Sequence, residues 1–368
     1  MKFTKIKINT KTQKYPIIIG SNLISKLNII IKENSIQFNK CFLIIDKNIP
    51  KKQIDKIKKS LKNKETIVYS IDANEKNKNQ RVADKILDKL LLKDFSREDC
   101  LISVGGGITG DLGGYVASLF KRGMQFINLP TTLLAQVDSC IGGKTGVNTK
   151  YGKNLIGTFY QPKLVISDSN FLKTLPPREI ICGYGEILKH SLIANKNFYR
   201  YLNINISNIL KLESPFIEKA ITESCKIKKI VVEKDEKEKN FRKILNFGHT
   251  FAHAYEATLG YSKKLNHGEA VLLGMKSALN FSLKEKLLKN HEFKSIINHI
   301  KISKLPNDLK KNFSIKHLNK IISFMQKDKK NTSDKINLIL LKKIGTPEIN
   351  KTYSKKNLKL FLEKELVN

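Results

Sequence analysis

Residues 100–118 read CLISVGGGITGDLGGYVAS, and this stretch decides the fold. A short apolar run typical of a buried strand enters a cluster of glycines and continues into a predicted helix. Gly105, Gly107 and Gly110 satisfy the pattern GxGxxG between the two elements. Glycine lets the backbone approach a pyrophosphate, and a helix N-terminus offers amide donors and the positive end of its dipole. Alone the motif is a weak signal, because a glycine-rich turn needed only for packing looks the same.

The surrounding sequence alternates strands and helices and so favours the nucleotide-binding interpretation. Strands are predicted at 16–20, 41–46, 65–72, 126–132 and 164–170, and a helix at 81–94. This order predicts βαβ units and a mostly parallel sheet. Asp46 ends one predicted strand, where a carboxylate could accept a hydrogen bond from a ribose hydroxyl, and Thr131 and Thr132 end another. The carboxyl ends of strands are where open α/β sheets bind ligands.

The predicted alternation of strands and helices ends at the pair Pro176–Pro177. Beyond it the pattern is almost entirely that of amphipathic helices, apart from 335–345, which could be a strand. We therefore predict an α/β protein with two domains. Residues 1–175 would form a Rossmann-like NAD-binding domain, and residues 176–368 an all-helical domain that binds metal and substrate.

Three histidines gather in the stretch NFGHTFAHAYEATLGYSKKLNHGE (246–269), although the chain has only 7. His249 and His253 are four residues apart and would share one helix face, and His267 follows a short polar loop. An isolated pair of this kind more often belongs to ordinary helix packing than to a metal site. Glu186, on a predicted helix, could supply the carboxylate of a Glu–His–His set, which is typical of a catalytic zinc site.

Polar and cationic residues near these motifs could surround an anionic substrate. A loop at 136–162 places cations and amides between glycines, which suits close contact with an anion. Arg242 and Asn246 are spaced i, i+4, and Asn246 and His249 are spaced i, i+3, which predicts one shared helix face. The candidates are Asp138, Lys144, Lys153, Asn154, Lys189, Lys228, Arg242 and Asn246.

Composition limits the compartment and the partners. The chain has no long apolar run and no signal-peptide pattern, and its five cysteines form no CxxC pair, so we expect a cytoplasmic protein with no membrane partner. The net charge of +35 raises the alternative of a nucleic-acid-binding protein, which predicts a salt-sensitive shift of DNA. Because the lysines are spread over the whole chain, we favour codon bias and expect no nucleic-acid partner.

Taken together, the motifs resemble the 3-dehydroquinate synthase family. The resemblance rests on GGGITGDLGGYVAS, RGMQFINLPTTLLAQVDSCIGGKTGVN, GKNLIGTFYQP, LKTLPPRE, LNFGHTFAHAYE and NHGEAV, and it extends to residues 328–345. It implies a homodimer, with NAD and Zn²⁺ (or Co²⁺) as cofactors and an active site in the cleft between two domains. The implied zinc ligands are Glu186, His249 and His267.

The resemblance also implies roles for other residues. NAD contacts are expected from Asp46, Glu75, Lys78, Gly107, Ile108, Thr109, Gly110, Asp111, Thr131, Thr132, Lys144, Lys153, Phe171, Leu172, Lys173 and Thr174. Substrate contacts are expected from Asp138, Lys144, Lys153, Asn154, Lys189, Lys228, Arg242, Asn246 and His253. Arg122 would reach the neighbouring subunit's phosphate site, Lys329 or Lys330 would join the substrate residues, and Glu238 matches a position proposed as a base. One departure is Asn74, which replaces a glycine of the family's nucleotide turn.

The implied substrate is 3-deoxy-D-arabino-heptulosonate 7-phosphate, a phosphorylated sugar acid. The implied reaction is a lyase reaction: transient NAD-dependent oxidation, β-elimination of phosphate, reduction, ring opening and an intramolecular aldol to 3-dehydroquinate, within the shikimate pathway of aromatic amino acid biosynthesis. Other NAD- and metal-dependent sugar-phosphate cyclases and glycerol-type metal dehydrogenases are the alternatives. The set of candidate cations favours a cyclase acting on a carboxylate- and phosphate-bearing sugar.

Overall fold

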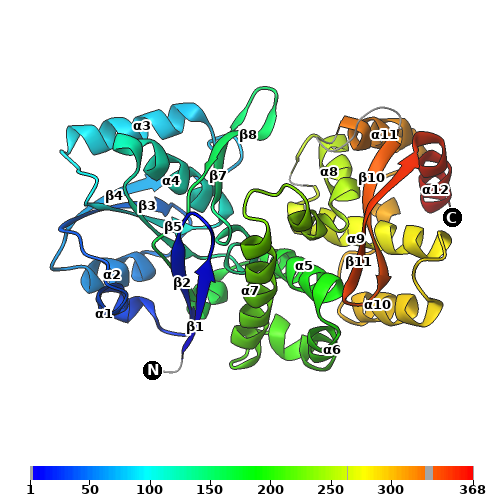
Figure 1. The fold of residues 1–368 in the computed structure, drawn as a ribbon, viewed down its shortest axis with the longest axis horizontal. Helices are drawn as coiled ribbons and strands as arrows, with labels where there is room; N and C mark the ends of the chain where they lie inside the picture. Colours follow the sequence, from blue (N-terminus) through cyan, green and yellow to red (C-terminus); the bar gives the residue numbers. More distant parts are fainter. Residues whose placement is uncertain (1–2, 263, 328–334, 368) are drawn as a thin grey trace. The chain divides into compact units, whose positions relative to one another are not determined.

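The computed structural model of the protein describes residues 3–262, 264–327 and 335–367 (Figure 1). Its contacts divide the chain into two compact units. Unit 1 consists of Met1–Pro176 together with Ser214–Lys237, and unit 2 consists of Pro177–Glu213 and Glu238–Asn368. The predicted single cut after residue 175 therefore differs from the structure in one segment. Residues 214–237, which contain one long helix, belong to the first unit instead of the second.

Unit 1 is built on a seven-stranded sheet with the order β1-β2-β9-β6-β5-β3-β4. All neighbouring strands are parallel except β1 and β2, which form an antiparallel pair at one edge. The α/β fold predicted from the sequence is thus confirmed. The strands are β1 (Phe3–Asn9), β2 (Lys14–Gly20), β3 (Lys40–Asp46), β4 (Glu65–Ile71), β5 (Cys100–Gly105), β6 (Gln125–Pro130) and β9 (Leu164–Asp168).

Helices cover both faces of this sheet and create two separate apolar cores (Figure 1). The alternation of side chains along β3 shows why: Leu43 and Ile45 point into one core, and Phe42 and Ile44 into the other. The covering helices are α1 (Leu27–Glu33) and α2 (Lys51–Ser60) on the first face, and α3 (Gln80–Leu92) and α4 (Gly107–Leu119) on the second. Strands buried on both faces read as continuous apolar runs, which is the pattern that identified them.

The loop predicted at 136–162, here called the lysine-rich loop, contains more structure than the sequence indicated. It holds a π-helical turn, η3 (Ala135–Ser139), and a two-stranded hairpin, β7 (Lys144–Thr149) and β8 (Gly152–Phe159). The remaining parts of unit 1 are the short helices η1 (Ile24–Lys26), η2 (Phe120–Arg122) and η4 (Ser169–Thr174), and the long helix α7 (Phe216–Lys234). Helix α7 packs against η3, β1 and β2.

Unit 2 is mainly helical, but it is not all-helical as predicted. Its antiparallel hairpin β10 (Lys335–Lys343) and β11 (Thr346–Ser354) begins where the sequence allowed a strand. The helices are α5 (Pro177–Ala194), α6 (Lys196–Leu210), η5 (Phe241–Asn246), α8 (His249–Thr258), α9 (His267–Lys284), α10 (Asn290–Ile302), η6 (Leu309–Lys311), η7 (Ile315–His317), α11 (Leu318–Lys327) and α12 (Lys355–Val367). None of the helices in the described ranges has the length and apolarity needed to cross a membrane.

Candidate active site

The strand order of unit 1 places the glycine motif at the point where the sheet changes direction. From β3 the chain proceeds to β4 on one side and then returns to β5 on the other side. Asp46 ends β3, and Gly105 ends β5 immediately before α4, so both lie at the carboxyl edge of this switch point. Open α/β sheets bind ligands at such a crevice. The predicted nucleotide residues at these strand ends are therefore brought to one edge.

The residues that follow the strands interact closely at this edge. The amide of Thr131 donates a hydrogen bond to the Gly105 carbonyl at 2.9 Å, and a Cβ on Gly106 would lie 3.1 Å from Thr132 Cγ2. Residues 107–111 form the first turns of α4, with Thr109 fully buried. Phe171 and Leu172 of η4 are also buried, and Phe171 packs in a core of unit 1.

The buried ammonium of Lys78 contacts two other predicted residues, Asp111 and Asn154. Lys78 Nζ lies 2.5 Å from Asp111 Oδ2 and 2.6 Å from Asn154 Oδ1. Burial raises the pKa of Asp111 above its ordinary value, although the ammonium of Lys78 opposes that shift. Next to this group, Lys153 Nζ pairs with Glu75 Oε1 at 2.9 Å. The sequence placed these residues in separate motifs, and the structure brings them together.

Asp138 and Lys228 form a second pair in unit 1. Asp138 lies in the π-helical turn η3, and Lys228 Nζ reaches its Oδ1 at 2.7 Å and its carbonyl at 2.6 Å. Lys228 is 4 % exposed. The long helix α7 thus places a buried cation beside the lysine-rich loop.

Four of the predicted cations are buried, unlike the other lysines and arginines of the described residues. Among the described residues, the only buried Lys or Arg side chains are Lys78, Lys189, Lys228 and Arg242. All four were predicted to contact nucleotide or substrate. Charged side chains are almost never fully buried unless they are paired or functional. In a chain with 68 Lys and Arg residues, this selectivity indicates a specific role for these four.

The other predicted cations are accessible. Lys144 begins β7 and is exposed, as is Arg122 on η2. Lys173 of η4 is also exposed, while Thr174 donates its hydroxyl hydrogen to the Phe171 carbonyl. Lys329 and its alternative Lys330 lie outside the described residues.

Unit 2 brings the Glu–His–His set together from three helices. Glu186 comes from the middle of α5, His249 from the start of α8 and His267 from the start of α9. One potential ligand atom from each lies within 4.8 Å of the others. The rings of His249 and His267 have centroids 5.7 Å apart, and His253 joins them at 5.4 Å from His249. His249 and His253 share one helix, as their spacing predicted.

The spacing of the donor atoms fits a metal ion. His249 Nε2 lies 3.6 Å from Glu186 Oε1, which is too long for a hydrogen bond. Two donors bound to a tetrahedral Zn²⁺ at about 2.0–2.2 Å lie roughly 3.3–3.6 Å apart. The Glu186 carboxylate is 1 % exposed; its Oε2 forms an ion pair with Lys189, whereas its Oε1 faces His249 and accepts no hydrogen bond from a described residue. A buried carboxylate of this kind has lone pairs available for a metal.

His249 is held in the state that a metal requires. Burial, together with Lys189 and the two neighbouring imidazoles, lowers the pKa of His249 well below its ordinary value, so the ring is neutral at pH 7. Its Nδ1 lies 3.2 Å from the carbonyl oxygen of Phe247 and donates to it, which leaves the Nε2 lone pair facing Glu186. Metal-binding histidines are usually oriented in this way by the hydrogen bond of the second nitrogen.

Glycines allow the three helices to approach closely enough. A Cβ on Gly268 would lie 2.2 Å from Cys182 Cα, so α9 contacts the backbone of α5 directly. A Cβ on Gly274 would lie 2.3 Å from the Gly248 carbonyl oxygen, so α9 also contacts the start of α8. Both contacts lie within about two turns of a histidine of the cluster. The glycines set the distance between the backbones that carry the candidate ligands.

One geometric prediction for this region was wrong. Arg242 and Asn246 lie on the 3₁₀ helix η5, and His249 starts a separate helix after Gly248, whose φ is +79°. The three residues therefore do not share the face of one helix, because Phe247 (ψ 122°) and Gly248 are both non-helical and separate the two helices. Asn246 instead donates to Glu238 Oε1 at 3.0 Å, which unites two predicted residues.

Glu256 is a residue near the histidines that the sequence reasoning missed. Its Oε2 lies 3.1 Å from His267 Nδ1, and the residue is 6 % exposed. Burial lowers the pKa of His267, but the charge and hydrogen bond of Glu256 outweigh this effect and raise it overall. Glu256 follows His249 by seven residues and His253 by three, so helical spacing could have revealed its position on the same face.

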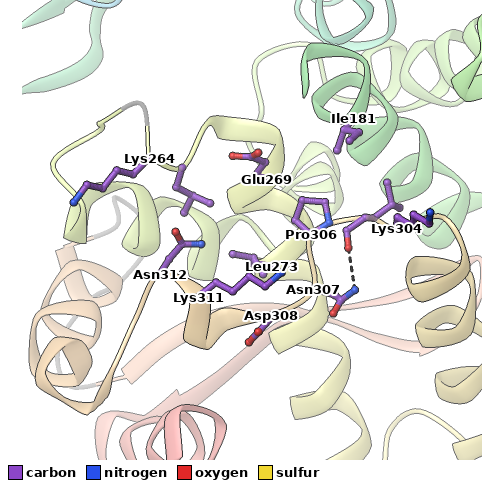
Figure 2. Close-up of a pocket in the computed structure, with 12 residues that line it drawn as sticks. Ile181, Lys264, Glu269, Leu273, Lys304, Pro306, Asn307, Asp308, Lys311 and Asn312 are labelled. Atoms are coloured by element: carbon purple, nitrogen blue, oxygen red, sulfur yellow. Dashed lines mark hydrogen bonds between the residues drawn. The ribbon is translucent and has the colours of Figure 1, made fainter. Parts of the chain in front are cut away.

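A separate hollow in unit 2 contains none of the predicted residues (Figure 2). It has a volume of about 450 Å³. Glu269 faces it, but its carboxylate is engaged with Arg178 at 2.5 and 2.7 Å and caps α9 through Asn266. The lining consists of Ile181, Lys264, Leu265, Glu269, Leu273, Lys304, Leu305, Pro306, Asn307, Asp308, Lys311 and Asn312. The potential metal ligands of unit 2, Glu186, His249 and His267, lie together away from this hollow's lining.

Comparison with known proteins decides the family. The model of the 3-dehydroquinate synthase N-terminal region matches residues 68–182, and that of the C-terminal region matches residues 183–331. The chain belongs to the 3-dehydroquinate synthase family. A 3-dehydroquinate synthase of Pelagibacter ubique (strain HTCC1062) is 60% identical over 366 residues and covers 100% of both chains.

Solved structures of two other synthases share the fold. A 2-deoxy-scyllo-inosose synthase complexed with carbaglucose-6-phosphate, NAD⁺ and Co²⁺ is 24% identical, with a TM-score of 0.87 over 98% of this chain and 100% of that one. A 2-epi-5-epi-valiolone synthase from Streptomyces hygroscopicus subsp. jinggangensis 5008, with NAD⁺ and Zn²⁺ bound, is 21% identical, with a TM-score of 0.85 over 97% and 98% of the two chains. These likenesses support the fold assignment of this family member.

Proposed function

We propose that this protein is a 3-dehydroquinate synthase that converts 3-deoxy-D-arabino-heptulosonate 7-phosphate to 3-dehydroquinate and phosphate. The observation that carries the proposal is the convergence of Glu186, His249 and His267 in a chain of this family. The reaction is a phosphate-eliminating lyase reaction of the shikimate pathway, and we place it in the cytoplasm.

The proposed cofactors are NAD and a divalent metal, Zn²⁺ or Co²⁺. When bound, they would supply the hydride acceptor and the Lewis acidity that a transient alcohol oxidation needs. The switch point of the sheet supports nucleotide binding at Asp46, the start of α4 and Thr131–Thr132. The 3.6 Å separation between His249 and Glu186 supports the metal site.

The chain's own residues would bind and orient the substrate. Lys189, Lys228 and Arg242 are buried cations, and we propose that they hold its phosphate and carboxylate groups. Asp138 holds the Lys228 ammonium in position at 2.7 Å. The exposed ring of His253 stands beside the candidate ligands and would take the proton of the reacting hydroxyl as a general base. The substrate's own phosphate is the proposed base for the elimination.

We also propose a homodimer. The hairpin β7–β8, which projects from unit 1 (Figure 1), exposes a group of apolar side chains along β8. Leu155, Ile156 and Phe159 are 41, 47 and 42 % exposed, and exposed apolar groups on an edge strand favour pairing with another chain. A second copy would cover them, and exposed Arg122 would then be available to the partner's phosphate site. Light scattering of the wild type and of Ile156→Lys tests this assembly, and a monomeric wild type refutes it.

The activity is tested by incubating purified, metal-loaded protein with NAD⁺ and the substrate while following phosphate and dehydroquinate together. We expect equal amounts of both products and no accumulation of NADH. An absence of phosphate release with NADH rising on simple polyols would indicate a metal-dependent dehydrogenase. Glu186→Gln and His267→Ala should lose bound zinc and activity together, and full activity in either variant contradicts the metal assignment.

A further inference from the structure

We propose that Glu256 is a positioning residue that fixes His267 as a metal ligand, which rests on the metal site proposed above. Its Oε2 lies 3.1 Å from Nδ1 of His267. A carboxylate can only accept, so the hydrogen bond requires a hydrogen on Nδ1. The lone pair of His267 then belongs to Nε2, the nitrogen free to bind a metal.

The environment of Glu256 is rigid enough for this role. Its α8 neighbour Tyr255 is fully buried, packs against Phe313 at a ring-centroid distance of 5.1 Å, and hydrogen bonds to Ser277 of α9 at 2.8 Å. The hydrogen bond from Tyr255 thus ties α8 to α9 at the residue next to Glu256. The side chain of Glu256 is 8 % exposed, so little water competes for its oxygen.

The two histidines of the site would be oriented by different acceptors. His249 donates from Nδ1 to the neutral carbonyl of Phe247, whereas His267 donates to a carboxylate. His267 is the more accessible ring, with 37 % of its side chain exposed compared with 12 % for His249. Because a carboxylate is a stronger acceptor than a neutral carbonyl, it selects one tautomer and one orientation of the more accessible ring. Glu256 supplies that acceptor from two turns beyond His249.

The test compares Glu256→Ala and Glu256→Gln with the wild type. Zinc affinity is measured by competition with a chromophoric chelator, and the tautomer of His267 in the metal-free protein by long-range ¹⁵N–¹H NMR. We expect Glu256→Ala to bind Zn²⁺ about 10–100-fold more weakly. Glu256→Gln keeps an oxygen that can accept, so its loss should be less than about tenfold. Loss of the Nδ1–H tautomer in Glu256→Ala is the second expected result.

Glu292→Ala is the matched control, since Glu292 is also a buried glutamate of unit 2 and accepts from the Ile344 amide. It should lower stability without changing zinc affinity. Unchanged zinc affinity and tautomer in Glu256→Ala overturn the proposal, and so does an equal loss of affinity in Glu292→Ala. A wild type that binds no Zn²⁺ overturns the metal site itself, which distinguishes that failure from a failure of Glu256 alone.

Discussion

The substitution Gly268→Ala should separate two candidate metal ligands without touching either side chain. The new Cβ would lie 2.2 Å from Cys182 Cα and 2.7 Å from the Cys182 carbonyl oxygen. Carbon atoms in ordinary contact are about 3.5–4.0 Å apart, so α9 must move from α5 by roughly 1.3–1.8 Å. Backbone atoms form the obstacle, and a change of rotamer cannot relieve the clash.

This movement is large compared with the tolerance of a metal site. Cys182 is four residues before Glu186 on α5, and Gly268 follows His267 on α9, so the displacement acts on both ligands. Ligand distances in metal sites hold within about 0.2 Å. We expect zinc affinity to fall at least about 100-fold, or about 2.8 kcal/mol. Overpacking should lower the free energy of unfolding of the metal-free protein by about 1–3 kcal/mol.

Gly185→Ala is the matched control on the other helix of the same crossing. Its Cβ would lie 3.2 Å from Leu272 Cγ and 3.3 Å from the Gly268 carbonyl oxygen, so a shift of a few tenths of an ångström suffices. Alanine also stabilises a helix interior by about 1 kcal/mol relative to glycine. Chelator competition and urea denaturation measure both quantities. The reasoning is refuted if Gly268→Ala binds Zn²⁺ as tightly as the wild type, or if the two variants behave alike.

Three further predictions follow from the buried groups. Burial lowers the pKa of His299 from 6.5 to about 4, so the unfolded chain binds the proton more tightly than the folded protein does. The contribution of His299 to the free energy of unfolding is therefore complete above pH 6.5. It declines by about 3 kcal/mol as the pH falls to 4. Urea denaturation at pH 7 and pH 4 should show this decline, and His299→Gln should reduce it; equal declines in both proteins contradict the assignment. Lys78→Met leaves the Asp111 carboxylate without its partner at 2.5 Å and should lower the free energy of unfolding by about 3 kcal/mol. This is the low end of the range for a broken buried pair, since the Asp111 side chain is 23 % exposed. The double variant Lys78→Met, Asp111→Leu should recover part of that loss in thermal denaturation. Zn²⁺ at a hundred times its dissociation constant should stabilise the wild type by about 2.7 kcal/mol and leave Glu186→Gln unchanged, and a stabilised Glu186→Gln would place the ion elsewhere.

The sequence predicted the parts of the site that depend on local pattern. The strand–glycine–helix unit at 100–118 and the pair His249–His253 appear where their spacing placed them, because periodicity is a property of a single element. The sequence could not show which of its many lysines are buried. That depends on which segments meet in space, as when α7 carries Lys228 to Asp138, ninety residues earlier in the chain.

The errors arose where tertiary contacts overrode local pattern. The spacing of Arg242, Asn246 and His249 fitted one helix, but η5 ends at Asn246, Phe247 has a non-helical ψ of 122°, and α8 starts anew after Gly248. Glu256 looked like an ordinary helix residue, because its significance depends on His267 from the next helix. The assignment of 214–237 to the second domain failed for a similar reason, since its apolar face packs against η3, β1 and β2.

Because α7 belongs to unit 1, this unit cannot finish folding on the ribosome until residue 237 has been synthesised. The chain passes from one unit to the other after Pro176, Glu213 and Lys237, so neither unit is one continuous segment. When residue 176 has been synthesised, all seven strands of the sheet have been made, but the helix α7 that packs against them has not. At about 5–20 residues per second, the following ~60 residues take roughly 3–12 s to appear. During that interval the surface that α7 covers stays exposed, and a fragment ending at residue 176 would expose it permanently.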